Sequence, residues 1–474
     1  MFSSIAGFNC LNEIFLFPLS GKFQPILATV TETEAEAEPA MVVAAVLLSL
    51  VAIYIASKAG GEFFNWLGFP PVLGELVGGV VIGISALNLV IFPESGADSS
   101  TSVIISILEA TAGLAPDAAE ATFQVQSEVL EVLSELGVII LLFEIGLESN
   151  IRDLMQVGIQ SLVVAIVGVT LPFVAGTAGM MMIFHVSAVP AIFAGAALTA
   201  TSIGITSRVL AEINRLNTQE GQIILGAAVI DDVLGIIILA VVASLAKTGE
   251  VDVVNAVYLI VSASVFLVGA ILLGRFFNDT FVFFGEKFKT RGRAVIPALT
   301  IALFMSYIGT AIHLEAILGA FAAGLVLDNL DQTEIGRELE ELIRPISDVV
   351  VPIFFVTVGT KTNLGVLNPA IPTNREGLVI AIFLIVVAIV GKVACGFSVF
   401  GLDKINRLAV GVGMVPRGEV GLVFASVGSA SGALSPALDV AIILMVIITT
   451  FLAPPLLRVV FGEGEAEEVA ETSG

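Results

Sequence analysis

Two adjacent aspartates, Asp231 and Asp232, lie in the middle of an otherwise apolar stretch that covers residues 221–246. Ionisable side chains are rare inside apolar segments of this length, because each one costs a few kcal/mol or more at membrane depth. Neighbouring residues on a helix point about 100° apart, so the two carboxylates cannot have the same surroundings. The pair therefore indicates a proton- or cation-binding site in which one carboxylate faces a cavity and the other reaches a neighbouring helix.

A second buried charge supplies the counter-ion that such a pair requires. Lys392 lies near the middle of the apolar stretch 377–400, away from the ends at which a lysine side chain can reach water. The neighbouring Gly391 permits close approach of another helix. A cation arriving between the carboxylates would displace the ammonium group and favour loss of its proton, which is the elementary step of cation–proton exchange.

Two further apolar stretches, 189–211 and 408–430, are interrupted near their centres by residues that break a membrane helix. Such breaks are tolerated at membrane depth only where protein or water satisfies the freed backbone groups. Hydroxyl and carbonyl oxygens suit a hard cation such as Na⁺, and we expect Asp231, Asp232 and Thr201 to coordinate it, although a threonine hydroxyl can equally bond its own backbone. The expected lining residues of the two breaks are Thr199, Ala200, Thr201, Ser202, Pro416, Arg417 and Glu419.

Two glutamates are weaker candidates for the same site. Glu75 lies in the stretch 70–92 and either lines a cavity or pairs at a helix contact. Glu144 lies toward one end of the stretch 129–147, where it either faces a cavity at its rim or is solvated. Spacing alone does not decide between these alternatives.

The elements that must position these residues are membrane-spanning helices. Of the 474 residues, 57% are apolar and only 13% are charged, against about 25% charged in soluble domains. This composition excludes a soluble enzyme or a nucleic-acid-binding protein, and we expect no catalytic residues and no cofactor. Two cysteines and two histidines are too few for a disulfide framework or a thiolate or histidine metal cluster.

A scan for stretches of about 20 apolar residues predicts an all-α polytopic membrane protein with about thirteen spans, at 40–57, 70–92, 129–147, 157–184, 189–211, 221–246, 253–275, 294–312, 314–330, 346–360, 377–400, 408–430 and 437–460.

The net charge of −23 belongs largely to segments outside these spans. We expect an acidic N-terminal tail at 1–39, an acidic C-terminal tail at 461–474 and a polar linker at 93–128, all solvated. A basic loop is expected at 276–293. With thirteen spans, fourteen basic residues fall in loops or at span ends on the C-terminal side, and four fall on the other side. The positive-inside rule then places the C-terminus in the cytoplasm and the N-terminus outside or in a lumen.

The chain also repeats itself. Residues 72–79 resemble residues 317–324, and residues 146–150 resemble residues 359–363. Seven spans separate the partners, an odd number, so the copies have opposite orientation, as in many secondary transporters. We therefore expect a six-plus-six inverted repeat, with 40–275 as the first repeat plus a linker helix and 294–460 as the second.

Together these motifs resemble the monovalent cation:proton antiporter-2 family, and within it the NapA-type sodium/proton antiporters. The resemblance covers roughly residues 40–460 and is carried by GFPPVLGELVGGVVIG (68–83), TATSIGITSRVL (199–210), the Asp-Asp pair, the lysine after IVG, and MVPRGEVGL (414–422). It implies an NhaA/NapA-like fold with two crossed broken helices, a dimerisation domain, and a mobile core domain that gives alternating access. It further implies that Asp232 binds the ion and carries the proton, that Asp231 pairs with Lys392, and that exchange is electrogenic.

The resemblance predicts Na⁺ or Li⁺ and H⁺ as the transported ions, membrane lipids as surroundings and a homodimer, with no nucleic acid. About 15 residues follow the last span, so we expect no soluble regulatory domain. The acidic N-terminal tail and the 93–128 linker lie outside the shared pattern and suggest a cyanobacterial member, in the inner or the thylakoid membrane. A K⁺/H⁺ antiporter of the same fold, a Na⁺-coupled organic-anion symporter and a channel are the alternatives, and the sequence leaves the choice of cation open.

Overall fold

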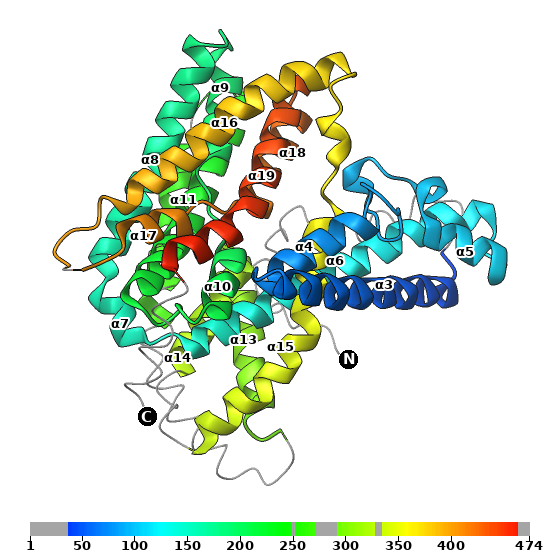
Figure 1. The fold of residues 1–474 in the computed structure, drawn as a ribbon, viewed down its shortest axis with the longest axis horizontal. Coiled ribbons are helices and arrows are strands. Elements are labelled where there is room, and N and C mark those ends of the chain that lie inside the picture. Colours follow the sequence, from blue (N-terminus) through cyan, green and yellow to red (C-terminus); the bar gives the residue numbers. More distant parts are fainter. Residues whose placement is uncertain are drawn as a thin grey trace, which may run out of the picture.

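The computed structural model describes residues 37–248, 250, 252–266, 268–270, 292–327, 334–402 and 404–462. Within these ranges the regular elements are all helices (Figure 1). Each of the thirteen predicted spans coincides with one helix or with two consecutive helices, so the predicted all-α polytopic fold is confirmed. Seven helices in the described ranges are long and apolar enough to cross a membrane. The predicted terminal tails and the basic loop lie almost entirely outside the described residues.

The helices form two bundles. The first, which we call the scaffold bundle, occupies the right and lower parts of Figure 1. It consists of α3 (Pro39–Trp66), α4 (Pro71–Ile82), α6 (Pro116–Glu148), α13 (Val295–Ala311), α14 (Ala316–Leu327) and α15 (Glu334–Thr360).

The second, which we call the core bundle, occupies the upper left of Figure 1. The short helix α7 (Ile151–Gln156) leads into it from α6. A separate helix at Val253–Ala270 follows the first half of the bundle along the chain. The core bundle consists of α8 (Gly158–Met182), α9 (Ala188–Ala197), α10 (Ile203–Glu212), α11 (Gln219–Thr248), α16 (Pro372–Gly396), α17 (Arg407–Gly413), α18 (Glu419–Ala430) and α19 (Pro436–Phe461).

Glycine contacts reveal the internal repeat in three dimensions. A Cβ at Gly79 of α4 would lie 2.8 Å from the Cα of Gly359 in α15. A Cβ at Gly324 of α14 would lie 2.7 Å from the Cα of Gly146 in α6. The sequence repeat pairs Gly79 with Gly324 and Gly146 with Gly359, so the two crossings are equivalent positions of the two halves. Each crossing joins one helix from each half, which interlocks the repeats within the scaffold bundle.

Glycine contacts also distinguish the packing within each bundle from the packing between the two bundles. Among the described residues, each glycine whose Cβ would collide with the backbone of another helix has that helix in its own bundle. Gly204, in the first turn of α10 in the core bundle, meets the scaffold bundle only through side chains, with Val138 at 3.4 Å and Phe354 at 3.5 Å from its would-be Cβ. Backbones therefore pack directly within each bundle, whereas at Gly204 the two bundles meet through side chains.

The prediction that the linker at 93–128 is solvated is wrong. It contains two 3₁₀ turns, η1 (Pro93–Ser95) and η2 (Ser99–Thr101), then α5 (Val103–Thr111) and the first turns of α6. Asp98 forms a capping box with Thr101, and the Ser102 hydroxyl caps α5 by accepting from the Ile105 N–H. Apolar residues spaced between the acidic ones are buried against α3 and hold the segment in place, namely Ile104, Ile105, Leu108, Ala119 and Phe123.

Two glutamates in and next to this region pair with one lysine. Lys361, directly after α15, lies 3.0 Å from a carboxylate oxygen of Glu94 and 2.6 Å from one of Glu131. Its ammonium group also lies 4.8 Å from the centre of the Phe92 ring. These contacts attach η1 and α6 to the end of α15.

Candidate functional site

The two predicted helix breaks cross each other inside the core bundle. The first separates α9 from α10 at residues 198–202, and the second separates α17 from α18 at residues 414–418. Each broken end leaves backbone groups without a partner in its own helix. The breaks satisfy one another, because the Ser202 N–H donates to the Pro416 carbonyl at 2.9 Å and the Thr201 hydroxyl donates to the Met414 carbonyl at 3.1 Å. The Thr206 hydroxyl adds a bond of 3.1 Å to the Gly413 carbonyl.

Arg417 holds the two breaks together. Its side chain is completely buried, and its guanidinium donates to the Leu198 carbonyl at 2.5 Å and to the Ala200 carbonyl at 2.7 Å. These carbonyls follow the C-terminal end of α9, where the helix dipole is negative and a cation is favoured. The sequence predicts Arg417 to line the site, whereas the structure gives it the role of a cap on the facing helix.

Lys392 on α16 pairs with Asp231 on α11. The ammonium nitrogen lies 2.9 Å from Asp231 Oδ2 and donates to the Thr201 hydroxyl at the same distance. Both charged side chains have no exposed surface. The second carboxylate oxygen of Asp231 has no hydrogen-bond partner among the described residues. The lysine thus connects the carboxylate pair to the first helix break.

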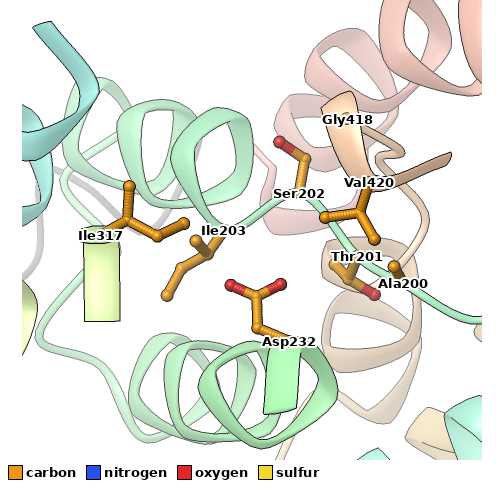
Figure 2. Close-up of a pocket in the computed structure, with 8 residues that line it drawn as sticks. All are labelled: Ala200, Thr201, Ser202, Ile203, Asp232, Ile317, Gly418 and Val420. Carbon is orange, nitrogen blue, oxygen red and sulfur yellow. The ribbon is translucent and has the colours of Figure 1, made fainter. Parts of the chain in front are cut away.

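The Asp232 side chain lines a small cavity (Figure 2). The cavity has a volume of about 10 Å³, roughly enough for one water-sized particle. The Asp232 carboxylate extends from α11 toward Ile203, which begins α10, and the residue is 2% exposed. The N-terminal end of α10 favours a negative charge at this place. The lining residues are Ala200, Thr201, Ser202, Ile203, Asp232, Ile317, Gly418 and Val420.

Sequence reasoning missed the apolar part of this cavity. Ile317 belongs to α14 of the scaffold bundle, so both bundles contribute to the wall around Asp232. Ile203 and Val420 complete the wall from the core bundle. Apolar residues within apolar helices carry no signal of such a position. The internal repeat gives only a hint, because Ile317 corresponds to Val72 at the start of α4.

Other predicted residues lie near the cavity but do not line it. The Thr199 hydroxyl donates to the Ala196 carbonyl at 2.7 Å, a bond within its own turn. Pro416 contributes its carbonyl to the crossing, and Glu419 begins α18. The side chain of Glu419 lies outside what the structure describes.

The two weaker candidates, Glu75 and Glu144, belong to the scaffold bundle and are absent from the cavity wall. Glu75 is 8% exposed and accepts a hydrogen bond of 3.0 Å from the Ser57 hydroxyl. Glu144 accepts a hydrogen bond from the Ser347 hydroxyl. Both therefore pair at helix contacts.

Charges at the crossing balance when all groups are ionised. Asp231 and Asp232 contribute two negative charges, and Lys392 and Arg417 contribute two positive ones. A guanidinium keeps its charge in proteins, whereas a buried ammonium can give up its proton when its anionic partner is engaged elsewhere. The arrangement can therefore accept a cation and release a proton without burying excess charge.

Comparison with known proteins gives the family. The family model described as "Sodium/hydrogen exchanger, transmembrane" matches residues 46–461. The chain belongs to this family. The resemblance inferred from the motifs is thereby confirmed, and the match covers both helix breaks, both aspartates and Lys392.

Two curated exchangers are similar over nearly their whole length. The chain is 59% identical over 458 residues to the high-affinity Na⁺/H⁺ antiporter NhaS3 of Synechocystis, covering 97% of this chain and 98% of that protein. It is 32% identical over 415 residues to the Na⁺/H⁺-K⁺ antiporter GerN of Bacillus cereus, covering 86% of this chain and 95% of that protein.

A solved exchanger has the same fold. The sodium proton antiporter MjNhaP1 of Methanocaldococcus jannaschii superposes with a TM-score of 0.60 at 17% identity. The match covers 88% of this chain and 96% of that one. At this identity the likeness concerns the fold.

Proposed function

We propose that this exchanger is a secondary active antiporter that exchanges Na⁺ for H⁺ by alternating access. The observation that carries the proposal is the buried Asp232 carboxylate in a cavity for one small particle, beside the Lys392–Asp231 pair at the helix crossing. The names of NhaS3 and GerN, both Na⁺/H⁺ antiporters, support the same exchange. The proposed cycle uses only the transported ions and the side chains of the chain, with no cofactor.

In the proposed cycle Na⁺ binds between Asp232 and the oxygens of the first helix break. Asp231 is one residue away, and its Oδ2 and the Thr201 hydroxyl are the two oxygens that Lys392 contacts. A cation that recruits either oxygen weakens the hold on the ammonium group, which then releases its proton. Protonation of Asp232 and Lys392 reverses the step and expels Na⁺, so the two ions compete for one site.

Counting charges in this cycle predicts electrogenic exchange. With Na⁺ bound and Lys392 neutral, Asp231, Asp232, Arg417 and the ion sum to zero. With Asp232 protonated and Lys392 charged, Asp231, Lys392 and Arg417 sum to one positive charge. The core bundle then moves one more positive charge in its proton-loaded form, which corresponds to two protons for each Na⁺.

The test is transport by the purified full chain in proteoliposomes that contain a pH-sensitive dye. After a pH gradient is imposed, Na⁺, Li⁺ or K⁺ is added in turn to the wild type, to Asp232→Asn and to Asp117→Asn. Asp117 is an exposed carboxylate in the first turn of α6 and serves as the matched control. We expect Na⁺ and Li⁺ to dissipate the gradient in the wild type and the control but not in Asp232→Asn. A response of Asp232→Asn equal to the wild type would exclude Asp232 as the ion carrier.

The K⁺ arm tests the second candidate function, K⁺/H⁺ antiport. GerN is described as a Na⁺/H⁺-K⁺ antiporter, and this description supports K⁺/H⁺ antiport as the second candidate. The small cavity at Asp232 favours the smaller ions. If only K⁺ dissipates the pH gradient, the proposed site stands but the transported cation is K⁺ and not Na⁺.

We further propose that the scaffold bundle forms a homodimer in the membrane and that the core bundle moves against it. Under the positive-inside rule, the ends of α10 and α19 and the start of α4 face the cytoplasm. The similarity to a Synechocystis protein is consistent with either the inner or the thylakoid membrane of a cyanobacterium. Native mass spectrometry from lipid nanodiscs tests the dimer, and labelling of single cysteines in sealed vesicles tests the orientation.

A further inference from the structure

A charged contact joins the far end of α10 to the scaffold bundle. Arg208 Nε lies 3.1 Å from Glu212 Oε1, and Glu212 Oε2 accepts a hydrogen bond of 3.4 Å from the Val72 N–H of α4. The Arg208 and Glu212 side chains are 24% and 12% exposed. Arg208 lies in the motif TATSIGITSRVL (199–210), and the sequence assigns neither it nor Glu212 to the ion site.

The start of α4 explains why a carboxylate binds there. Pro71 begins the helix and has no N–H, so Val72 is the first residue of α4 that can donate. An N–H in the first turn has no partner within the helix, and the helix dipole favours a negative charge beside it. Glu212 therefore caps a scaffold helix from the core bundle.

Arg208 reinforces this contact with further carboxylates. It interacts electrostatically with Glu75 on α4 and Glu144 on α6, in addition to Glu212 on its own helix. Glu75 Oε2 is buried and has no hydrogen-bond partner among the described residues. One guanidinium thus attracts two scaffold helices to α10.

The position of α10 makes this contact relevant to transport. The helix begins at Ile203 in the wall of the Asp232 cavity and ends at Glu212, a length of about 15 Å for ten residues. Movement at one end therefore moves the other. Elsewhere the inter-bundle interface is loosely packed, with an apolar cavity of about 180 Å³ between α14 and the helices α8 and α11.

We propose that Arg208 and Glu212 form a latch between α10 and α4 that keeps the cytoplasmic half of the inter-bundle interface closed, and that the latch opens once in each transport cycle. This inference rests on the proposed function for the moving core bundle and for the cytoplasmic side. It makes Arg208 and Glu212 positioning residues, since neither contacts the ion cavity.

The test measures opening directly and does not depend on Na⁺ transport. Val138 on α6 faces Gly204 near the start of α10 and is 6% exposed, so a cysteine at this position becomes accessible only when the bundles separate. The Val138→Cys reporter is placed in a Cys10→Ser background, and a membrane-impermeant thiol reagent is added to the cytoplasmic side of vesicles that hold the full chain. The Cys10→Ser protein without Val138→Cys is labelled in parallel, and its signal is subtracted to correct for the buried Cys395.

Glu212→Gln and Arg208→Gln are compared with Glu62→Gln. Glu62 forms the same kind of i,i+4 pair with Lys58 at 2.7 Å, but it lies on the exposed surface of α3. We expect both latch variants to increase the labelling rate of the reporter cysteine about two- to fivefold, the range that one charge at a helix end supplies, and the control to leave it unchanged.

Equal labelling in both latch variants and the control, with monodisperse protein in all three, would overturn the proposal. An increase seen only with reagent on the opposite side would also overturn it, because the latch would then close the other half. Antiport is measured separately on the same vesicles. If the proposed function is wrong, the wild type will show no Na⁺-dependent proton movement in this measurement, whatever the labelling rates are.

Discussion

The Asp231–Lys392 pair provides the sharpest test of the energetics of the site. Both side chains are completely buried, and removal of one partner of a buried ion pair leaves an uncompensated charge that costs about 3–5 kcal/mol. Asp231→Asn keeps the shape of the side chain, and Lys392→Met keeps most of its volume, so neither creates a large cavity. We expect each single variant to lower the thermal unfolding midpoint by about 5–10 °C.

The double variant separates this explanation from ordinary packing damage. Replacing both partners removes the unpaired charge, so Asp231→Asn combined with Lys392→Met should unfold close to the wild-type midpoint. Thermal unfolding of the purified protein in detergent measures all four proteins under the same conditions. The exposed pair of Lys58 and Glu62 supplies the control. Glu62→Gln, Lys58→Met and the double variant should each leave the unfolding midpoint unchanged, because an exposed ion pair contributes little to stability.

One result would refute the reasoning. If the decreases caused by the two single variants add in the double variant, the side chains act independently. The ion pair would then contribute nothing specific to the stability of the site. The assignment of Lys392 as the charge that the cation displaces would lose its structural basis with it.

Three other predictions follow from the same contacts. Gly359→Val should abolish the yield of folded protein on size-exclusion chromatography, because the would-be Cβ lies 2.9 Å from the Gly79 Cα, whereas Gly204→Ala should fold. Arg417→Lys keeps the charge but loses one of its two hydrogen bonds to carbonyls of the first break, so it should lower the unfolding midpoint by several degrees and reduce transport at least tenfold in proteoliposomes. Lys392→Met removes one transported proton, so any remaining exchange should no longer respond to an imposed membrane potential; persistence of the response would contradict the charge count.

Much of this molecule could be predicted from the sequence, because membrane-spanning helices follow from apolar length and buried charges from their rarity. The thirteen spans, the breaks near residues 200 and 416, and the inverted repeat all depend on such local signals. Proline and glycine mark the second break, and a cluster of hydroxyl residues marks the first. The proximity of Lys392 to Asp231 follows from the need for a counter-charge.

Other features depend on contacts that the sequence does not encode locally. The acidic residues of the 93–128 linker predict solvation, yet its apolar residues pack on α3, and Lys361 pairs with Glu94 in it and with Glu131 farther along α6. The break sequence predicts Arg417 at the cavity, yet its long side chain reaches the carbonyls of Leu198 and Ala200, in the first break more than 200 residues earlier. Ile317 gives no signal, because an isoleucine in an apolar helix has no distinguishing neighbour in the sequence.

The division between glycine contacts within the bundles and side-chain contacts between them has a consequence for evolution. A change at a glycine such as Gly79 or Gly146 affects the assembly of a bundle and therefore whether any protein accumulates. A change at Val138 or Glu212, whose side chains lie between the bundles, acts on the contact between them and not on the backbone crossings within them. The glycines at the crossings are therefore expected to tolerate little substitution among related chains, whereas the interface side chains are expected to vary more freely, and a survey of such chains tests this.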